Sequence, residues 1–142
     1  MIRPGQSVDV EMRAHREATN IHIEIWYSGN NDLQFELVDS AYTSLGTCFL
    51  GNDRNIVYHN QVIGSISHDT NHENGDRVIT IIPDPVSLGN GMWIGRWNLR
   101  LTNLSPVKEA GYHAWMNPGG APGTAYFHTP TLSHTINSLA CC

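Results

Sequence analysis

The sequence predicts an all-β protein, an antiparallel β-sandwich or jelly roll of about eight strands. Apolar and polar residues alternate with a period of two along most of the chain, which is the pattern of half-buried strands. Clusters of Gly, Asn, Asp and Pro interrupt this pattern roughly every 8 to 15 residues, as turns do. Charged residues make up only 15% of the composition, which favours short strands and loops over long surface helices. The length of 142 residues, with no linker or repeat, predicts one domain over residues 1–142.

The first half of the chain contains three clear strand patterns. SVDVEMRA, residues 7–14, places four apolar side chains on one face. IHIEIWY, residues 21–27, and LQFELVD, residues 33–39, each place three apolar side chains on one face, and they lie on either side of the turn cluster SGNND. We therefore expect these two strands to form a hairpin. The face of residues 21–27 opposite the isoleucines carries His22, Glu24 and Trp26.

Further strands follow, and no segment has a convincing helical pattern. QVIGSIS (61–67) and DRVITIIP (76–83) flank HDTNHENG, whose Asn74-Gly75 pair predicts a hairpin turn. MWIGRWNLRLTN (92–103) and GYHAWM (111–116) alternate again. In residues 92–103 the pattern places Trp97, Leu99 and Leu101 inward and Asn98, Arg100 and Thr102 outward.

Charge and hydropathy exclude two classes of partner. The formal net charge of -5 leaves no basic patch to displace counterions from phosphates, so we expect no nucleic-acid partner. No apolar run approaches the roughly 18 residues that a membrane-spanning helix needs, and no signal peptide opens the chain, so we expect no membrane partner.

The cysteines do not have metal-ligand spacing. Cys48, Cys141 and Cys142 are odd in number, and a disulfide between neighbours would strain the intervening peptide. One bridge from Cys48 to the terminal pair remains open, but buried free thiols are the favoured interpretation.

The segment HDTNHENGD is the strongest candidate for an ion site, but its spacing fits no established motif. It gathers His68, Asp69, His72, Glu73 and Asp76. For an EF-hand its glycine falls one place too late, and the twelfth loop position would be Thr80 instead of a bidentate glutamate. A solvated hairpin tip is therefore favoured. The glycines of LGNGMWIG precede a strand, not a helix, and are read as turn residues instead of a phosphate loop. We therefore expect no metal or cofactor.

No catalytic constellation is present in the sequence. No serine lies in a G-x-S-x-G turn, Cys48 has no neighbouring base, and Asp39 and Asp53 fall in or beside loops where solvation explains them. We expect no catalytic residue in this chain. Asn103-Leu104-Ser105 is formally a glycosylation acceptor.

The order of the segments resembles a known family. IEIWYSGNNDLQFELVDS, DRVITIIP, GMWIGRWNLRLTN, GYHAWM and TPTLSHTINSLACC are together similar to the jelly-roll domain inserted in bacterial subtilisin-like serine proteases, the subtilase family, whose architecture is similar to the P domain of proprotein convertases. The resemblance runs from about Glu11 to the end, and Thr135 to Ser138 match the family's return to the protease fold, although Leu139 stands where proline is common.

This resemblance implies a non-catalytic accessory domain of a larger serine endopeptidase. Residues 129–142 would return to the protease domain, and residues 1–7, with Met1 as a cloning start, would be a linker. The partner would be the protease domain of the same chain. The cysteines favour a reducing compartment and the resemblance favours export, so both localisations stay open.

Two alternatives belong to other classes. One is a free-standing module that binds carbohydrate or a cell-surface ligand through Trp93 or Trp115 together with Tyr42 or Tyr58. The other is a small metal-dependent β-sandwich enzyme, which would need three converging histidines.

Overall fold

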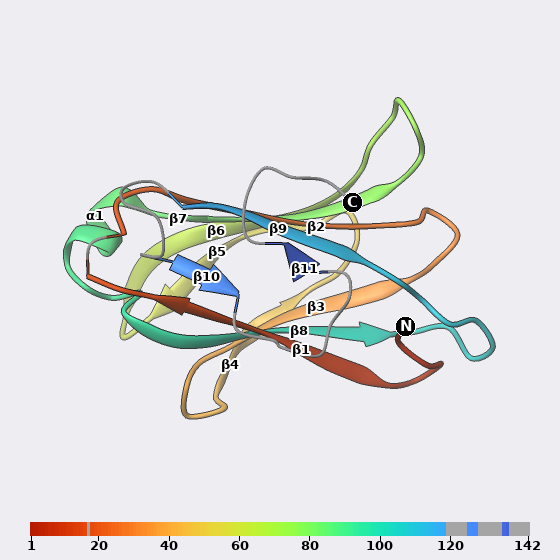
Figure 1. The fold of residues 1–142 in the computed structure, drawn as a ribbon, viewed down its shortest axis with the longest axis horizontal. Coiled ribbons are helices and arrows are strands. Elements are labelled where there is room, and N and C mark those ends of the chain that lie inside the picture. The colour runs from red at the N-terminus through yellow and green to blue at the C-terminus, as the bar shows by residue number, and fades with distance from the viewer. Residues whose placement is uncertain (17, 119–124, 128–134, 137–142) are drawn as a thin grey trace.

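The computed structural model describes residues 1–16, 18–118, 125–127 and 135–136, which form eleven strands and one short helix. The strands build two facing sheets, with β2, β7 and β9 in one layer and β1, β3 and β8 in the other (Figure 1). The elements in chain order are β1 Ser7–Ala14, β2 Ile21–Tyr27, β3 Leu33–Val38, β4 Ser44–Cys48, β5 Asp53–Tyr58, β6 Gln61–Thr70, β7 Arg77–Pro83, α1 Pro85–Gly89, β8 Gly95–Asn103, β9 His113–Pro118, β10 Ala125–Phe127 and β11 Thr135–Ile136.

The predicted β-sandwich is confirmed. One sheet has the order β10-β1-β8-β3-β4 and the other β11-β9-β2-β7-β6-β5. The pairs of named strands are antiparallel, except for the parallel pair β9 and β11. The order β1-β8-β3 beside β9-β2-β7 pairs strands that are distant in sequence, which is typical of a jelly roll. The strand count exceeds the expected eight because short edge strands such as β4 and β10 carry too few alternating positions to be recognised.

The core lies between the sheets and consists of the apolar faces that the sequence predicts. In β2, β3 and β8 the predicted inward residues are fully buried, and Ile23 and Ile25 of β2 lie opposite Ile81 and Ile79 of β7. Each such side chain contributes about 1.5 to 3 kcal/mol when it is removed from water. This burial fixes the register, because a slip by one residue would turn a whole apolar face to solvent.

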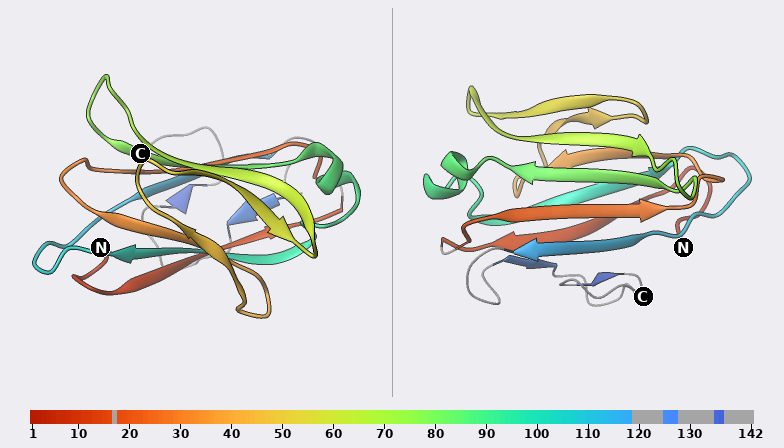
Figure 2. Two further views of the ribbon diagram at one scale, coloured as in Figure 1. Left: turned by 180° about the vertical axis from the view of Figure 1, so that it is seen from behind. Right: turned by 90° about the horizontal axis from the view of Figure 1, so that it is seen from above.

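The predicted hairpin between residues 21–27 and 33–39 is wrong. β2 pairs with β7 and β9, whereas β3 pairs with β8 and β4 in the opposite sheet. The turn cluster between them carries the chain from one layer to the other, as the two further views show (Figure 2). Alternation places an apolar face toward the core in either sheet, so it does not determine which sheet a strand joins.

The second predicted hairpin is confirmed. β6 and β7 pair from Gly64 and Pro83 to Thr70 and Arg77. A single helical turn that the sequence did not predict, α1, follows β7. Asp84 caps its N-terminus, because the Asp84 Oδ2 atom accepts hydrogen bonds from the backbone N–H groups of Val86 and Ser87 at 3.1 and 3.2 Å.

The start of the chain and one outer-face residue of β8 are more buried than expected. Ile2 lies in the core and exchanges backbone hydrogen bonds of 2.6 and 2.9 Å with Ala110, so the start of the chain is part of the sandwich. Asn98, expected to face solvent, is only 4% exposed. It lies on the outer face of β8 opposite Val38 of β3, which is also buried. Arg96, two positions earlier on the same strand, lies over the ring of Tyr42. In the part of the chain that the structure describes, no helix is long and apolar enough to cross a bilayer.

Candidate functional site

The hairpin tip between β6 and β7 does not bring the candidate ion ligands together. His68 lies in β6 and points into the core, whereas His72 and Glu73 are exposed in the turn. The strand continues to Thr70, and the inward position of Ile66 places His68 inward as well. Over the described ranges, no three His, Cys, Asp or Glu side chains lie close enough to hold a metal ion.

His68 instead joins the two sheets inside the core. Its Nδ1 atom lies 3.2 Å from the backbone oxygen of Cys48 in β4, and its Nε2 atom lies 2.6 Å from the hydroxyl of Tyr27 in β2. A carbonyl only accepts, so Nδ1 carries the proton and Nε2 accepts from Tyr27. Burial lowers the pKa of His68 and raises the pKa of the Tyr27 phenol, which keeps both groups neutral.

Cys48 is a buried thiol with a structural role. Its Sγ atom lies 3.2 Å from the backbone oxygen of Asn52, to which it donates. Burial raises the pKa of the thiol, so the reactive thiolate is disfavoured. Cys141 and Cys142 lie outside the described residues, as does most of the segment 129–142.

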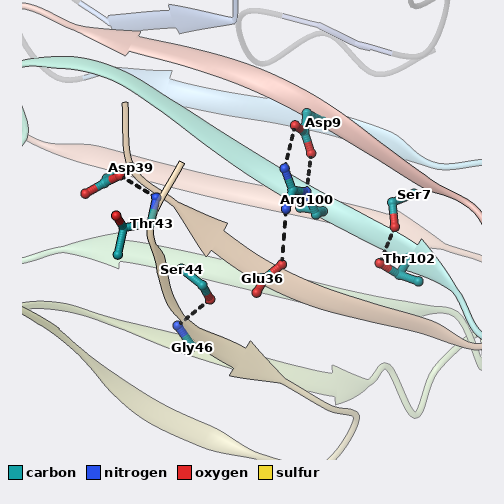
Figure 3. Close-up of polar contacts among 9 residues, drawn as sticks. All are labelled: Ser7, Asp9, Glu36, Asp39, Thr43, Ser44, Gly46, Arg100 and Thr102. Atoms are coloured by element: carbon teal, nitrogen blue, oxygen red, sulfur yellow. Dashed lines mark hydrogen bonds and ion pairs between the residues drawn. The ribbon is translucent and has the colours of Figure 1, made fainter. Parts of the chain in front are cut away.

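The two carboxylates assigned to solvated loops differ from each other. Asp53 is exposed at the start of β5, as expected. Asp39 is only 8% exposed, and its Oδ1 atom accepts hydrogen bonds from the N–H groups of Ala41 and Thr43 at 2.9 and 2.8 Å. Asp39 therefore holds the loop between β3 and β4 (Figure 3), and solvation does not explain this residue.

The outer face of the β1-β8-β3 sheet carries a charge-paired row. Arg100 of β8 contacts Asp9 through two bonds, Nε to Oδ1 at 2.7 Å and Nη2 to Oδ2 at 3.1 Å. Its Nη1 atom lies 3.6 Å from Oε1 of Glu36 on the other side (Figure 3). Further along the row Glu11 pairs with Arg13 and Arg96, so three arginines face three carboxylates and this row acts as a structural cross-link.

The formal glycosylation acceptor is not accessible. Asn103 is fully buried, and its Nδ2 atom donates to the backbone oxygens of Ile2 and Lys108 at 3.0 and 2.7 Å. Its Oδ1 atom accepts from the N–H group of Ser105 at 3.0 Å. The amide is fully used in fixing the loop after β8 to the N-terminal segment, so it cannot accept a glycan in the folded protein.

The alternative binding module would pair Trp93 or Trp115 with Tyr42 or Tyr58, and the structure does not form such a pair. Trp93 is buried, and its Nε1 atom donates to the backbone oxygen of Ile63 at 2.9 Å. Tyr58 packs edge-on against Trp97, with ring centroids 5.3 Å apart. Tyr42 is 63% exposed in the loop after β3, whereas Trp115 lies on β9 of the opposite sheet. No pair of these four rings forms the expected coplanar surface.

A different aromatic group lies on the outer face of β2 and β9. The Trp26 Nε1 atom donates to Oε1 of Glu24 at 2.8 Å, and the other carboxylate oxygen lies 2.9 Å from Nε2 of His22. The His22 ring stacks on Trp115, with centroids 5.7 Å apart and planes 10° from parallel. We call these four residues the outer-face cluster. The sequence placed three of them on one face, but the fourth comes from a strand whose pairing with β2 it did not predict.

An open groove of about 320 Å³ adjoins this cluster at the end of β2. Trp26 and His113 line it from the two strands, and Asn31 and Asp76 line it from two loops. Tyr27 and Tyr112 also line it, but both are buried. We call it the Trp26 groove. The two loops meet closely, because a Cβ atom on Gly29 would collide with the backbone oxygen of Gly75. Sequence reasoning missed this groove, since its walls come from four separate segments.

Comparison with known proteins gives a similarity of fold. No protein-family model matches the sequence, and no curated protein matches it. The solved structure of the Clostridium perfringens CspB protease is similar, with a TM-score of 0.56 and 18% sequence identity. The similarity covers 81% of this chain but 24% of the protease chain, so this chain corresponds to about a quarter of that protein's length. This sandwich therefore shares its fold with part of a protease.

Proposed function

We propose that this chain is a non-catalytic jelly-roll accessory domain of a subtilisin-like serine peptidase, which braces the protease domain or restricts access to its active site. The observation that carries the proposal is the similarity of 81% of the chain to 24% of a protease chain. A domain that corresponds to so small a share of a protease leaves most of such a chain for the catalytic fold.

The absence of protease motifs from the sequence supports an accessory role. The chain contains no Asp-[Ser/Thr]-Gly, His-Gly-Thr or Gly-Thr-Ser-Met-Ala segment; Asp39-Ser40-Ala41 and Gly123-Thr124-Ala125 come nearest. In the structure Asp39 is committed to its own loop through hydrogen bonds to Ala41 and Thr43. This carboxylate therefore stabilises the sandwich and is not placed to orient a catalytic histidine.

The partner in this proposal is the protease domain of the same chain. Exposed apolar side chains occur on the two segments that the Ile2 and Ala110 pair joins: Met1 is 70% exposed and Val107 is 78% exposed. Leu104, on the same segment as Val107, is 41% exposed, and a group of exposed apolar side chains fits an interdomain contact. We propose that this end of the sandwich, which lies opposite α1 in Figure 1, docks on the protease domain.

The test begins with the complete reading frame that encodes this chain. The proposal expects a subtilisin-like catalytic domain in the same protein, and no casein hydrolysis or labelling by a serine-directed phosphonate with the 142-residue chain alone. A reading frame without such a domain, or turnover by the isolated chain, would overturn it.

Variants of the complete protein separate the two roles. Val107→Asp should lower the temperature at which the protease loses activity if the domain is a brace, because it places a charge in the proposed contact. Val86→Asp on α1 is the matched control, since Val86 is 69% exposed at the opposite end. Restricted access predicts instead that Val107→Asp speeds casein hydrolysis while hydrolysis of a short peptide stays constant. If Val107→Asp matches Val86→Asp in both assays, the proposed contact is wrong.

A further inference from the structure

We propose that the Trp26 groove binds a neutral carbohydrate, with a sugar ring stacked on Trp26 and sugar hydroxyl groups hydrogen-bonded to the Asp76 carboxylate and the Asn31 amide. The inference goes beyond the proposed protease association and does not depend on it. It rests on three properties of the groove: a fixed aromatic ring, polar groups held by their loops, and a charge that selects against acidic ligands.

The ring of Trp26 is held in place before any ligand arrives. Its indole N–H donates to Glu24, the Glu24 carboxylate is held in turn by His22, and His22 stacks on Trp115. Trp26 is therefore pre-organised, which reduces the entropy lost when a ligand binds. Its indole N–H is committed to Glu24, so the ring offers a ligand its apolar face. The C–H groups of a pyranose ring present an apolar face of matching shape.

The loops that line the groove are fixed through their backbones. The backbone N–H of Asn31 donates to the backbone oxygen of Ser28 at 3.0 Å, and the backbone oxygen of Asn31 accepts from Nη1 of Arg77 at 2.6 Å. The N–H of Asp76 donates to Oδ1 of Asn74 at 2.9 Å.

These anchors leave the Asn31 amide and the Asp76 carboxylate without a side-chain hydrogen bond to other described residues. A carboxylate accepts from hydroxyls, and an amide both donates and accepts, which suits the paired donors and acceptors of a sugar.

Charge and shape favour a neutral sugar over two other ligands. Asp76 in the groove, Glu24 beside it and the net charge of -5 repel uronic and sialic acids. The guanidinium of Arg77 reaches the lining, but it donates to the backbone oxygen of Asn31 and lies 4.0 Å from Oδ1 of Asp32, which offsets its charge.

A quaternary ammonium ion would prefer aromatic faces on several sides. Tyr27 and Tyr112 are each only 3% exposed, and the exposed ring of His113 is a polar imidazole, so Trp26 is the accessible apolar aromatic wall among the described lining residues. An open groove with one such wall suits a flat ligand lying on the ring.

The experiment is a titration of the ¹⁵N-labelled chain with cellotetraose, chitotetraose and maltotetraose, followed by NMR and calorimetry. At least one tetrasaccharide should shift the Trp26 indole N–H signal and bind with a Kd of about 0.1 to 10 mM, since one stacked ring and a few hydrogen bonds contribute. Tetragalacturonate and tetramethylammonium serve as the acidic and cationic probes.

Variants assign the binding to this groove. Trp26→Ala should weaken binding about tenfold or more, Trp26→Phe should retain part of it, and Asp76→Asn should weaken it about threefold to tenfold. Tyr42→Ala is the control, because Tyr42 is an exposed ring outside the groove. A thermal melt of each variant establishes that it is folded, and Trp26→Phe keeps the test decisive if Trp26→Ala unfolds.

Four results would overturn the proposal. The first is that none of the neutral tetrasaccharides binds, and the second is that tetramethylammonium alone binds. The third is preferential binding of tetragalacturonate. The fourth is binding of undiminished affinity by every Trp26 variant that folds, which would place the sugar elsewhere. None of these results depends on whether the complete protein is a protease, so the two proposals fail separately.

Discussion

The hydroxyl of Tyr27 lies 2.6 Å from Nε2 of His68, within the apolar core. Because the other ring nitrogen of His68 contacts the backbone oxygen of Cys48, this imidazole connects β2 and β6 of one sheet to β4 of the other. Burial disfavours the charged imidazolium and lowers the pKa of His68, so the ring is neutral and its unprotonated Nε2 atom accepts from the Tyr27 hydroxyl.

We expect the free energy of unfolding to fall as the pH falls below about 6.5. Burial lowers the pKa of His68 in the folded state, so the unfolded chain takes up a proton over a pH range in which the folded chain does not. The contribution of His68 is therefore fully present above the unfolded pKa and is lost as the pH falls toward the lowered folded pKa. Urea unfolding at about pH 7.5 and about pH 5 measures the loss of unfolding free energy. The loss should be about 1.4 kcal/mol for each unit by which burial lowers the pKa of His68.

The matched variants for this prediction are His68→Gln and His72→Gln. His68→Gln should be less stable at neutral pH but should lose less stability on acidification. His72 is exposed in the turn, so His72→Gln should retain the pH dependence of the original chain. Equal pH dependence in His68→Gln and the original chain would contradict the assignment.

Tyr27→Phe should destabilise the protein by about 1 to 3 kcal/mol at neutral pH. The substitution keeps the ring but leaves Nε2 of His68 buried without the hydroxyl that donates to it. Tyr42→Phe removes a hydroxyl from an exposed ring and should change stability by less than about 0.5 kcal/mol. Urea unfolding at pH 7 compares the two, and equal small effects would show that the buried hydrogen bond is not stabilising.

The sequence was sufficient to predict which side chains face the core. Ile23 and Leu99 are buried where the alternation of β2 and β8 places them, because burial of one face is a local property of a strand. The pairing of strands is not local. β2 lies between β7 and β9, and its turn-linked neighbour β3 lies in the other sheet. No turn signal could have shown this, since the core accepts an apolar face from either layer.

The same limit explains the errors at individual residues. His68 was assigned to a turn because Asn74-Gly75 marks the centre of the hairpin, but β6 extends to Thr70 and carries His68 inward. Asn103 matched a surface motif, yet its amide closes a loop onto Ile2, which lies at the other end of the sequence. Trp26 was placed on the correct face, whereas the groove beside it depends on loops that only the fold brings together.

Asn103→Ala should cost about 2 kcal/mol or more in unfolding free energy. It removes the partners of two backbone oxygens and one N–H group, and it leaves the Ile2 carbonyl without this buried donor. Asn55→Ala is the control, because Asn55 is exposed on edge strand β5.

A secreting eukaryotic host should add no glycan at Asn103 to the folded chain, as measured by intact mass. A glycan at Asn103 on folded protein would contradict its burial.

Arg100→Lys should destabilise the protein by about 0.5 to 1.5 kcal/mol although it keeps the charge. Lysine cannot reproduce the paired bonds to both Asp9 oxygens while also reaching Glu36. Because the row is partly exposed, raising the salt concentration to about 1 M should reduce the difference between the two proteins. Arg3→Lys, at an exposed position, should have little effect. Equal stability of Arg100→Lys and Arg3→Lys at low salt would show that the paired geometry contributes nothing.

Gly29→Ala should destabilise the protein by about 1 to 3 kcal/mol, because the added Cβ atom would collide with the backbone oxygen of Gly75 and separate the two loops. Gly89→Ala is the matched control. Its Cβ atom would meet no atom within 4 Å, and alanine favours helix, so we expect a neutral or slightly stabilising effect. Thermal unfolding measures both variants. The loops that Gly29→Ala separates carry Asn31 and Asp76, so this variant should also weaken binding of neutral tetrasaccharides while the Trp26 ring stays in place. Full stability of Gly29→Ala would mean that the loops yield without cost, and they would then be too soft to hold the groove in shape.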